Sequence, residues 1–258
     1  MTTALIARIL SALTLSIVLA ASRAVATGFD QTHALFTTVL ARHVQEARVD
    51  YATLKTNSAD LSRYLGQVAA VGRAEFSRWS EPARIAFLTN AYNAYTLRLI
   101  IDHYPVKSIK DIGSFLKGPW DQPSVQLFGE TTTLNTLEHK ILRVDYAEPR
   151  LHFALICAAK GCPPLRSEAY VGERLDEQFS DQAREFLATP TKNRIEAGER
   201  TVYLSPIFKW YGGDFEKKSG SVLAALQPYW PGGSGTGATA DFKIRFTDYD
   251  WSLNEQTK

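Results

Sequence analysis

The residues best suited to chemistry lie in the stretch "RLHFALICAAKGCPPL", residues 150–165. Cys157 ends a run of apolar residues, and Lys160 and Arg166 lie near it in the chain. Positive charge and free backbone N–H groups make a thiol more nucleophilic, because they stabilise its thiolate form. Catalytic groups also commonly sit on loops that a rigid element holds in place. The leading interpretation is therefore a reactive thiol at Cys157.

Two structural interpretations compete with the reactive thiol. A Cys157–Cys162 disulfide would close a very small loop. It would therefore add little stability, because it restricts the unfolded chain only slightly, but an exported protein could form it. A zinc site would combine both cysteines with His139 and His152. It is the weakest of the three, because no histidine pair at the usual zinc spacing accompanies the cysteines. We therefore predict no metal and no cofactor.

The adjacent residues Glu138 and His139 form the second candidate group. Asn135 and Glu138 have the spacing of a capping box, in which Glu138 would bond back to the start of a helix. His139 would then lie in the first helical turn, where the helix dipole disfavours a charged imidazole. Since a neutral imidazole can act as a general base, the sequence predicts His139 as the base for Cys157.

Two asparagines and a histidine are further candidates. Asn90 and Asn93 are three residues apart, so they share one face of a helix. Buried amides usually fix a neighbouring loop; alternatively one of them, Asn93 in our prediction, orients a catalytic imidazole or holds an oxyanion. His152 precedes Cys157 in the apolar run, with its ring against the core or a carboxylate, and is either structural or part of a binding site.

A cluster nearer the C-terminal end combines aromatic rings with charges of both signs. The motif "SPIFKWYGGDF" contains Lys209, Trp210, Tyr211 and Asp214. These side chains either form the floor of a binding cleft or make a packed corner with a Lys209–Asp214 ion pair. The cleft is the interpretation that would give the protein a ligand.

Hydrophobic periodicity predicts the elements that must position these residues. A long helix begins with Ser80 as its N-cap and Pro82 in its first turn, and Pro105 ends it. It is apolar nearly all round, so it is predicted to be the buried central helix. A hairpin over 125–134 turns at Gly129. The other predicted helices are 30–47, 61–68, 135–143, 175–186 and 222–230, and the other predicted strands are 151–156, 201–204 and 242–246.

Helices dominate the front of the chain and strands the back, which favours an α+β fold. We predict a helical N-terminal half packed on a mostly antiparallel sheet, and a single domain over residues 27–258. A papain-like or transglutaminase-like arrangement is suggested by analogy alone.

The N-terminal residues and the composition indicate a location. Arg8 precedes an apolar stretch too short to span a bilayer comfortably, and Ala24 and Ala26 have signal-peptidase spacing, so residues 1–26 are predicted to be a signal peptide. An uncleaved anchor is the alternative. We expect a periplasmic or secreted protein without an integral membrane segment after cleavage. The formal net charge of +2 gives no reason to expect a nucleic-acid partner.

Several long motifs resemble one family. The motifs "FLTNAYNAYTL", "LNTLEHKILR", "HFALICAAKGCPPLRSEAY", "LSPIFKWYGGDF" and "DYDWSLN" occur in the order and spacing of the domain-of-unknown-function family 547 (DUF547), in its bacterial exported branch. The resemblance implies no settled activity. Plant members of the family tend to have serine where Cys162 stands, which implies that the fold does not require a Cys157–Cys162 disulfide and favours the thiol interpretation.

The sequence therefore supports two main hypotheses. In the first, the protein is a cysteine-dependent acyl-transfer enzyme, a peptidase, amidase or transglutaminase-like protein, with Cys157 as nucleophile and His139 as base. Glu138 or Asn93 would orient the imidazole. In the second, the protein is a non-enzymatic module that binds a peptide or small ligand with the 209–214 cluster. A thiol-disulfide or metal site is a weaker third hypothesis.

Overall fold

The computed structural model describes residues 28–114, 116–231 and 241–257. The predicted signal peptide lies outside these residues. Within them, no helix combines the length and apolar character that a membrane crossing needs.

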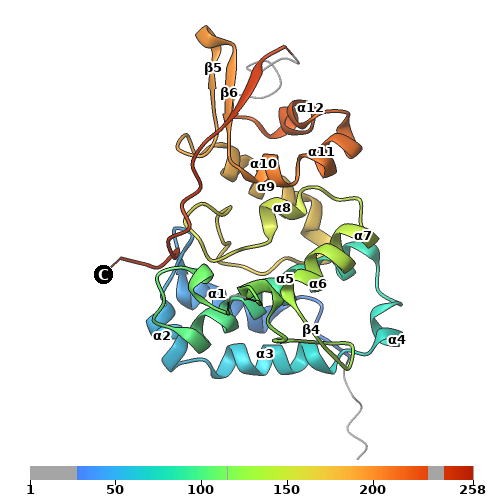
Figure 1. Cartoon of the computed structure of the whole chain (residues 1–258). Helices are drawn as coiled ribbons and strands as arrows, with labels where there is room; N and C mark the ends of the chain where they lie inside the picture. The colour runs from blue at the N-terminus through green and yellow to red at the C-terminus, as the bar shows by residue number, and fades with distance from the viewer. Residues whose placement is uncertain (1–27, 115, 232–240, 258) are drawn as a thin grey trace, which may run out of the picture.

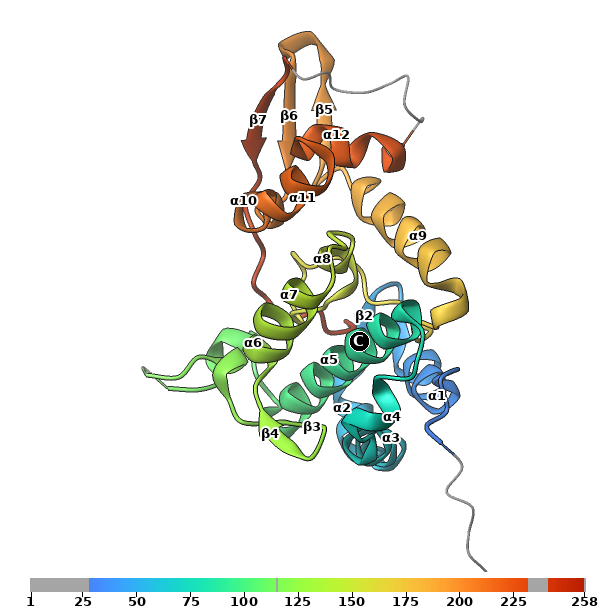
Figure 2. The same cartoon turned by 90° about the vertical axis from the view of Figure 1, so that its right-hand side faces the viewer.

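The N-terminal half is a bundle of helices around one buried helix, α5. Figures 1 and 2 show this bundle at the bottom of the molecule. Its helices are α1 (Ala34–His43), α2 (Tyr51–Thr56), α3 (Ala59–Ala70), α4 (Arg73–Phe76) and α5 (Glu81–His103). The start of α5 is confirmed as predicted, since the Ser80 side chain accepts a hydrogen bond from the Ala83 N–H and a proline occupies the first turn. Its apolar circumference is buried by the surrounding helices, which makes α5 the centre of the first hydrophobic core.

Two short hairpins flank this bundle. The strands β1 (Val44–Gln45) and β2 (Arg48–Val49) form the first one. The predicted helix over 30–47 is therefore wrong at its end, because Glu46 and Ala47 adopt positive φ angles that a right-handed helix cannot contain. The second hairpin is confirmed as predicted: β3 (Val125–Leu127) and β4 (Glu130–Thr132) pair antiparallel, and Phe128 and Gly129 supply the positive φ angles of a two-residue turn.

The C-terminal part forms a second, smaller lobe with its own core. A three-stranded sheet in the order β5-β6-β7 lies at the top of Figures 1 and 2, with helices beside it. Strands β5 and β6 are antiparallel, whereas β6 and β7 are parallel. The α+β class is thus confirmed, with small sheets. The elements are α9 (Leu175–Leu187), β5 (Arg194–Glu196), β6 (Thr201–Leu204), α10 (Ile207–Trp210), α11 (Gly212–Ser219), α12 (Val222–Leu226) and β7 (Lys243–Phe246).

Short helices connect the lobes and complete the surface. The π-helix η3 (Leu137–Leu142) lies between α6 (Leu134–Thr136) and α7 (Arg143–Asp145), and α8 (Leu151–Ala154) follows. The 3-10 turns are η1 (Ile109–Asp111), η2 (Pro119–Asp121), η4 (Gly172–Arg174), η5 (Ala197–Glu199) and η6 (Gln227–Tyr229).

The predicted strand over 151–156 is wrong. Residues Leu151–Ala154 form the helical turn α8, and the Leu155 N–H donates to the Leu151 carbonyl at 3.0 Å. A short run that is apolar at every position does not distinguish a buried strand from a buried helix. Here the helical rotation lets Phe153 join the second core while Ala154 and Leu155 join the first. The turn α8 therefore links the two cores.

The C-terminal residues 247–257, which we call the C-terminal strap, run from β7 back to the first lobe (Figure 1). The Leu253 N–H donates to the Lys107 carbonyl at 2.8 Å, and the Asn254 N–H donates to the Ala158 carbonyl at 3.0 Å. The Asn254 side chain also accepts from the Tyr51 hydroxyl at 2.7 Å. The strap thereby holds the two lobes together on the side of residues 157–162.

We predict that Gly161→Ala destabilises the protein by about 1–3 kcal/mol, because overpacking forces neighbouring groups to shift. A β-carbon at Gly161 would come within 2.9 Å of the Tyr249 ring. Urea unfolding of both proteins measures this difference. The matched control is Gly198→Ala, where a β-carbon meets nothing within 4 Å. Equal stability of the Gly161 variant and the wild type would show that the strap can move away from this glycine.

Candidate functional site

A cavity of about 250 Å³ lies between the two lobes. Its wall is largely aromatic, with polar groups and both cysteines among the rings. The aromatic lining residues are Tyr92, Trp120, Trp210, Tyr211, Tyr249 and Trp251. The polar and sulfur-containing ones are Asp121, Asn135, Glu138, His139, His152, Cys157 and Cys162.

The π-helix η3 positions Glu138 and His139. Such wide helical turns are rare and frequently occur at functional sites. The predicted capping box is wrong: the Thr133 side chain, not that of Asn135, accepts from the Thr136 N–H, and the Glu138 carboxylate accepts from the Tyr92 hydroxyl. Both η3 residues line the cavity instead.

The carboxylate of Glu138 is buried and receives hydrogen bonds from tyrosines. Glu138 is 6% exposed, and its Oε2 accepts from the Tyr92 hydroxyl at 3.0 Å. Burial raises the pKa of Tyr92 well above its usual value, and the negative charge of Glu138 adds to this. Burial and the same carboxylate raise the pKa of Tyr211. Both phenols therefore stay protonated and can donate to Glu138.

The imidazole of His139 is oriented by an arginine. Its Nδ1 lies 2.7 Å from Nη1 of Arg143. Because a guanidinium only donates hydrogen bonds, Nδ1 must be the acceptor, and the ring proton is on Nε2. This Nε2 lies 3.8 Å from Oε1 of Glu138. The imidazole thus presents its Nε2–H group on the side of Glu138. Its basic nitrogen, Nδ1, is already bound to Arg143.

Asp214 lies behind this wall and binds two cationic or potentially cationic side chains. Its oxygens accept from Arg143 at 2.7 and 3.0 Å and from Nε2 of His152 at 2.8 Å. The hydrogen bond from His152, together with that from Arg143, holds the pKa of Asp214 well below its usual value. The Lys209–Asp214 pair considered above does not occur among the ion pairs of the described residues.

His152 completes the link between Asp214 and the cavity. Its ring stacks on Tyr211, with centroids 4.0 Å apart and planes 19° from parallel. The stacked tyrosine lines the cavity beside Glu138. The expected placement of His152 against a carboxylate therefore agrees with the structure, and the ring supports Tyr211.

The two asparagines bind backbone segments and do not line the cavity. The Asn93 side chain donates to the Ala154 carbonyl at 2.9 Å and accepts from the Ile156 N–H at 3.0 Å. Asn90 makes the same pair of bonds to the backbone of Tyr170. Since both ends of the Asn93 amide are engaged, it positions the segment before Cys157 and does not contact the His139 imidazole.

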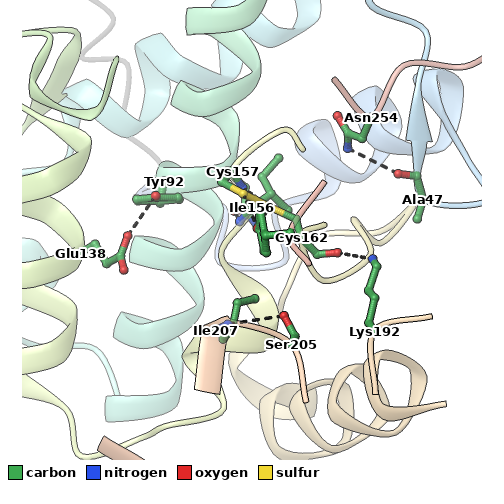
Figure 3. Close-up of a disulfide and its surroundings, with 12 residues drawn as sticks. Ala47, Tyr92, Glu138, Ile156, Cys157, Cys162, Lys192, Ser205, Ile207 and Asn254 are labelled. Atoms are coloured by element: carbon green, nitrogen blue, oxygen red, sulfur yellow. Dashed lines mark hydrogen bonds between the residues drawn. A yellow bond between two sulfur atoms is a disulfide. The ribbon is translucent and has the colours of Figure 1, made fainter. Parts of the chain in front are cut away.

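The two cysteines form a disulfide, with Cα atoms 6.1 Å apart. The N–H of Cys157 lies 2.8 Å from Sγ of Cys162, and the Tyr249 hydroxyl lies 3.0 Å from Sγ of Cys157. Figure 3 shows the disulfide between the Tyr92–Glu138 pair and Lys192. In this oxidised form neither sulfur is a free thiol or a thiolate ligand, so a nucleophilic Cys157 requires reduction.

Several residues of the site were not predicted from the sequence. Arg143 lies in the motif "LNTLEHKILR", but its spacing to Asp214 in the chain gives no signal of their contact. Tyr249 and Trp251 lie in the motif "DYDWSLN", from which we predicted no site residue, yet both line the cavity. Of the predicted cluster near the C-terminal end, Trp210 and Tyr211 line it and Lys209 does not.

We predict that Asp214→Asn destabilises the protein at pH 7 by about 1–3 kcal/mol, the usual loss for a hydrogen bond to a charged group. A carboxyl whose folded-state pKa is depressed contributes stability above its unfolded pKa and loses it as the pH falls. The difference from wild type should therefore be larger at pH 7 than at pH 3 in urea unfolding. The matched control on the same helix is the exposed Glu216→Gln. An equal difference at both pH values would contradict the assigned network.

Comparison of the sequence with known protein families gives one match. Residues 76–187 match the family model described as "Protein of unknown function, DUF547". No curated protein and no solved structure matches the chain. The matched part, which contains α5, the π-helix and both cysteines, supports the resemblance to DUF547, a family whose description assigns no activity.

Proposed function

We propose that this chain is an exported protein whose cavity binds a small ligand, or one side chain of a peptide, that carries a positive charge. The observation that supports this proposal most directly is the charge of the residues that line the cavity. Among the described residues that line the cavity, Asp121 and Glu138 are acidic and none is a lysine or arginine. Arg143, the nearest cation described above, is neutralised by Asp214. A cation in the cavity would therefore meet two carboxylates and, among the described lining residues, no lysine or arginine.

The aromatic wall supports the same ligand class. A cation within about 6 Å of a ring centroid is attracted by the negative face of the ring, most strongly for tryptophan. Rings of the cavity wall already make such contacts within the described residues, since Lys110 Nζ lies 3.7 Å from the Trp251 centroid and Arg143 Cζ lies 5.0 Å from the Tyr211 centroid. The combination of tryptophan and tyrosine faces with a buried carboxylate is suited to an ammonium or guanidinium group.

The size of the cavity limits the ligand. At about 250 Å³, it is slightly smaller than the usual range of roughly 300–1,000 Å³ for small-molecule sites. It is therefore suited to a small amine or to one side chain of a longer peptide. The predicted signal sequence and the disulfide both support an exported location, because disulfides persist mainly in oxidising compartments.

The proposal predicts that butylammonium binds at least about tenfold more tightly than 1-butanol, because only the ammonium ion interacts with both the carboxylates and the ring faces. Glu138→Gln should weaken butylammonium binding by about tenfold or more and leave butanol binding nearly unchanged. Isothermal titration calorimetry measures both affinities. Fluorescence of the cavity tryptophans gives an independent signal.

The control for this experiment is Asp145→Asn, an exposed carboxylate in the same helical segment that does not line the cavity. It changes the net charge by the same amount and should leave binding within about twofold, because exposed charges are screened by salt. Equal affinity for the amine and the alcohol, or an equal loss in both variants, would rule out the proposed site.

A cysteine-dependent acyl-transfer activity is the second candidate. Its supporting observation is that Cys157 and His139 line the same cavity. After reduction, the Cys157 thiolate would attack an acyl carbon, and an imidazole proton would go to the leaving group. This candidate ranks second because it needs a reduced disulfide and because Nδ1 of His139 is already bound to Arg143.

This second function predicts that, in the reduced protein, iodoacetamide labels Cys157 well below pH 8. His139→Gln should slow the labelling at pH 7 by about tenfold if the imidazole assists formation of the thiolate. Mass spectrometry of the labelled peptide gives the rate at each cysteine. Unchanged labelling in the His139 variant would remove His139 as the base for Cys157.

A further inference from the structure

We propose that the Cys157–Cys162 disulfide exchanges with small thiols that enter the cavity, and that the incoming thiolate attacks Cys157 while Cys162 is the leaving group. The preferred thiols would carry an ammonium group, a refinement that rests on the proposed cation-binding function. The direction of attack depends only on the surroundings of the two sulfurs.

Access to the two sulfurs differs. Both cysteines line the cavity, but Cys157 is partly exposed whereas Cys162 is only 3% exposed. Thiol–disulfide exchange depends on which sulfur the attacking thiolate can reach. An incoming thiol therefore meets Sγ of Cys157 first.

The stabilisation of negative charge also differs between the sulfurs. Sγ of Cys162 lies 2.8 Å from the Cys157 N–H and 3.4 Å from the Tyr249 hydroxyl, and both groups can donate to it. The same hydroxyl lies 3.0 Å from Sγ of Cys157, so it can turn to whichever sulfur carries charge. Since the N–H contact is already present before exchange, Cys162 is the better stabilised thiolate, and a stabilised thiolate leaves faster.

A lysine adds positive charge behind Cys162. Lys192 Nζ lies 2.6 Å from the carbonyl oxygen of Cys162, as Figure 3 shows. Burial lowers the pKa of Lys192 to about 8, so the ammonium form still predominates at pH 7. Nearby cations favour the thiolate form of a cysteine.

The exchange step balances without another reactant. The thiolate sulfur of the small thiol forms a bond to Sγ of Cys157, and the bond between the two protein sulfurs breaks. Its electron pair goes to Sγ of Cys162, which the two donors stabilise and which then takes a proton from solvent. The products are a mixed disulfide at Cys157 and a thiol at Cys162. The thiolate of a second small thiol then attacks the sulfur of the first, the bond from that sulfur to Sγ of Cys157 breaks, and Cys157 leaves as a thiolate that takes a proton from solvent. The two small thiols are thereby joined in a disulfide and both protein cysteines are reduced.

The test is to locate the mixed disulfide. The oxidised protein is incubated briefly with cysteamine, quenched in acid and alkylated, and its peptides are analysed by mass spectrometry. Trypsin cleavage after Lys160 separates the two cysteines. We expect cysteamine on Cys157 and the alkyl group on Cys162, with a preference of at least about tenfold. An oxidised synthetic peptide of residues 150–166 is the control without the fold and should show little preference.

Cysteamine on Cys162, or the same distribution in the protein and the peptide, would overturn the inference. Tyr249→Phe should slow exchange by about tenfold through the loss of one charged hydrogen bond and still give the Cys157 product. The rates of cysteamine, 2-mercaptoethanol and 2-mercaptoethanesulfonate, compared as their thiolates, test the other proposal separately. Attack at Cys157 with equal rates for the three would support the exchange and contradict the cation preference.

Discussion

The carboxylate of Asp214 joins three separate elements of the site. It lies on α11, accepts two hydrogen bonds from Arg143 on α7 and accepts one from His152 on α8. Arg143 in turn fixes the His139 imidazole, and His152 supports the ring of Tyr211. Hydrogen bonds to an ionised group are shorter and stronger than neutral ones, and a two-bond arginine–carboxylate pair also fixes the relative geometry of its partners. This one anion therefore helps to orient His152 directly, His139 through Arg143, and Tyr211 through the stacked ring of His152.

The hydrogen bonds around Asp214 also bear on why acidic groups outnumber lysines and arginines in the described part of the cavity lining. Arg143 contacts His139 of the wall, and its charge is paired with that of Asp214. Glu138, on the other side, is held by tyrosine hydroxyls, which donate hydrogen bonds but bring no charge. A buried carboxylate without a cationic partner is costly, and the proposed cationic ligand would reduce this cost. The disulfide forms part of the same wall, so its chemistry would be exposed to any ligand that enters.

Local patterns predicted much of the fold but less of the site. The N-cap of α5 at Ser80 and the hairpin turn at Gly129 depend on neighbouring residues, so they could be found from the sequence. The helical turn before Cys157 could not, because a run of apolar residues satisfies a helix and a strand equally well. The motifs contained Glu138, His139 and Tyr211, yet their partners come from distant segments. Such contacts are set by the packing of two cores, which periodicity does not describe.

A crystal structure of the protein with an alkylammonium ion tests the central claim most directly. The account predicts that the nitrogen lies within hydrogen-bonding distance, about 3 Å, of a carboxylate oxygen of Glu138 or Asp121 and within about 6 Å of a Trp or Tyr ring centroid. Binding outside the cavity, or an anion found in the cavity in its place, would contradict the proposed function.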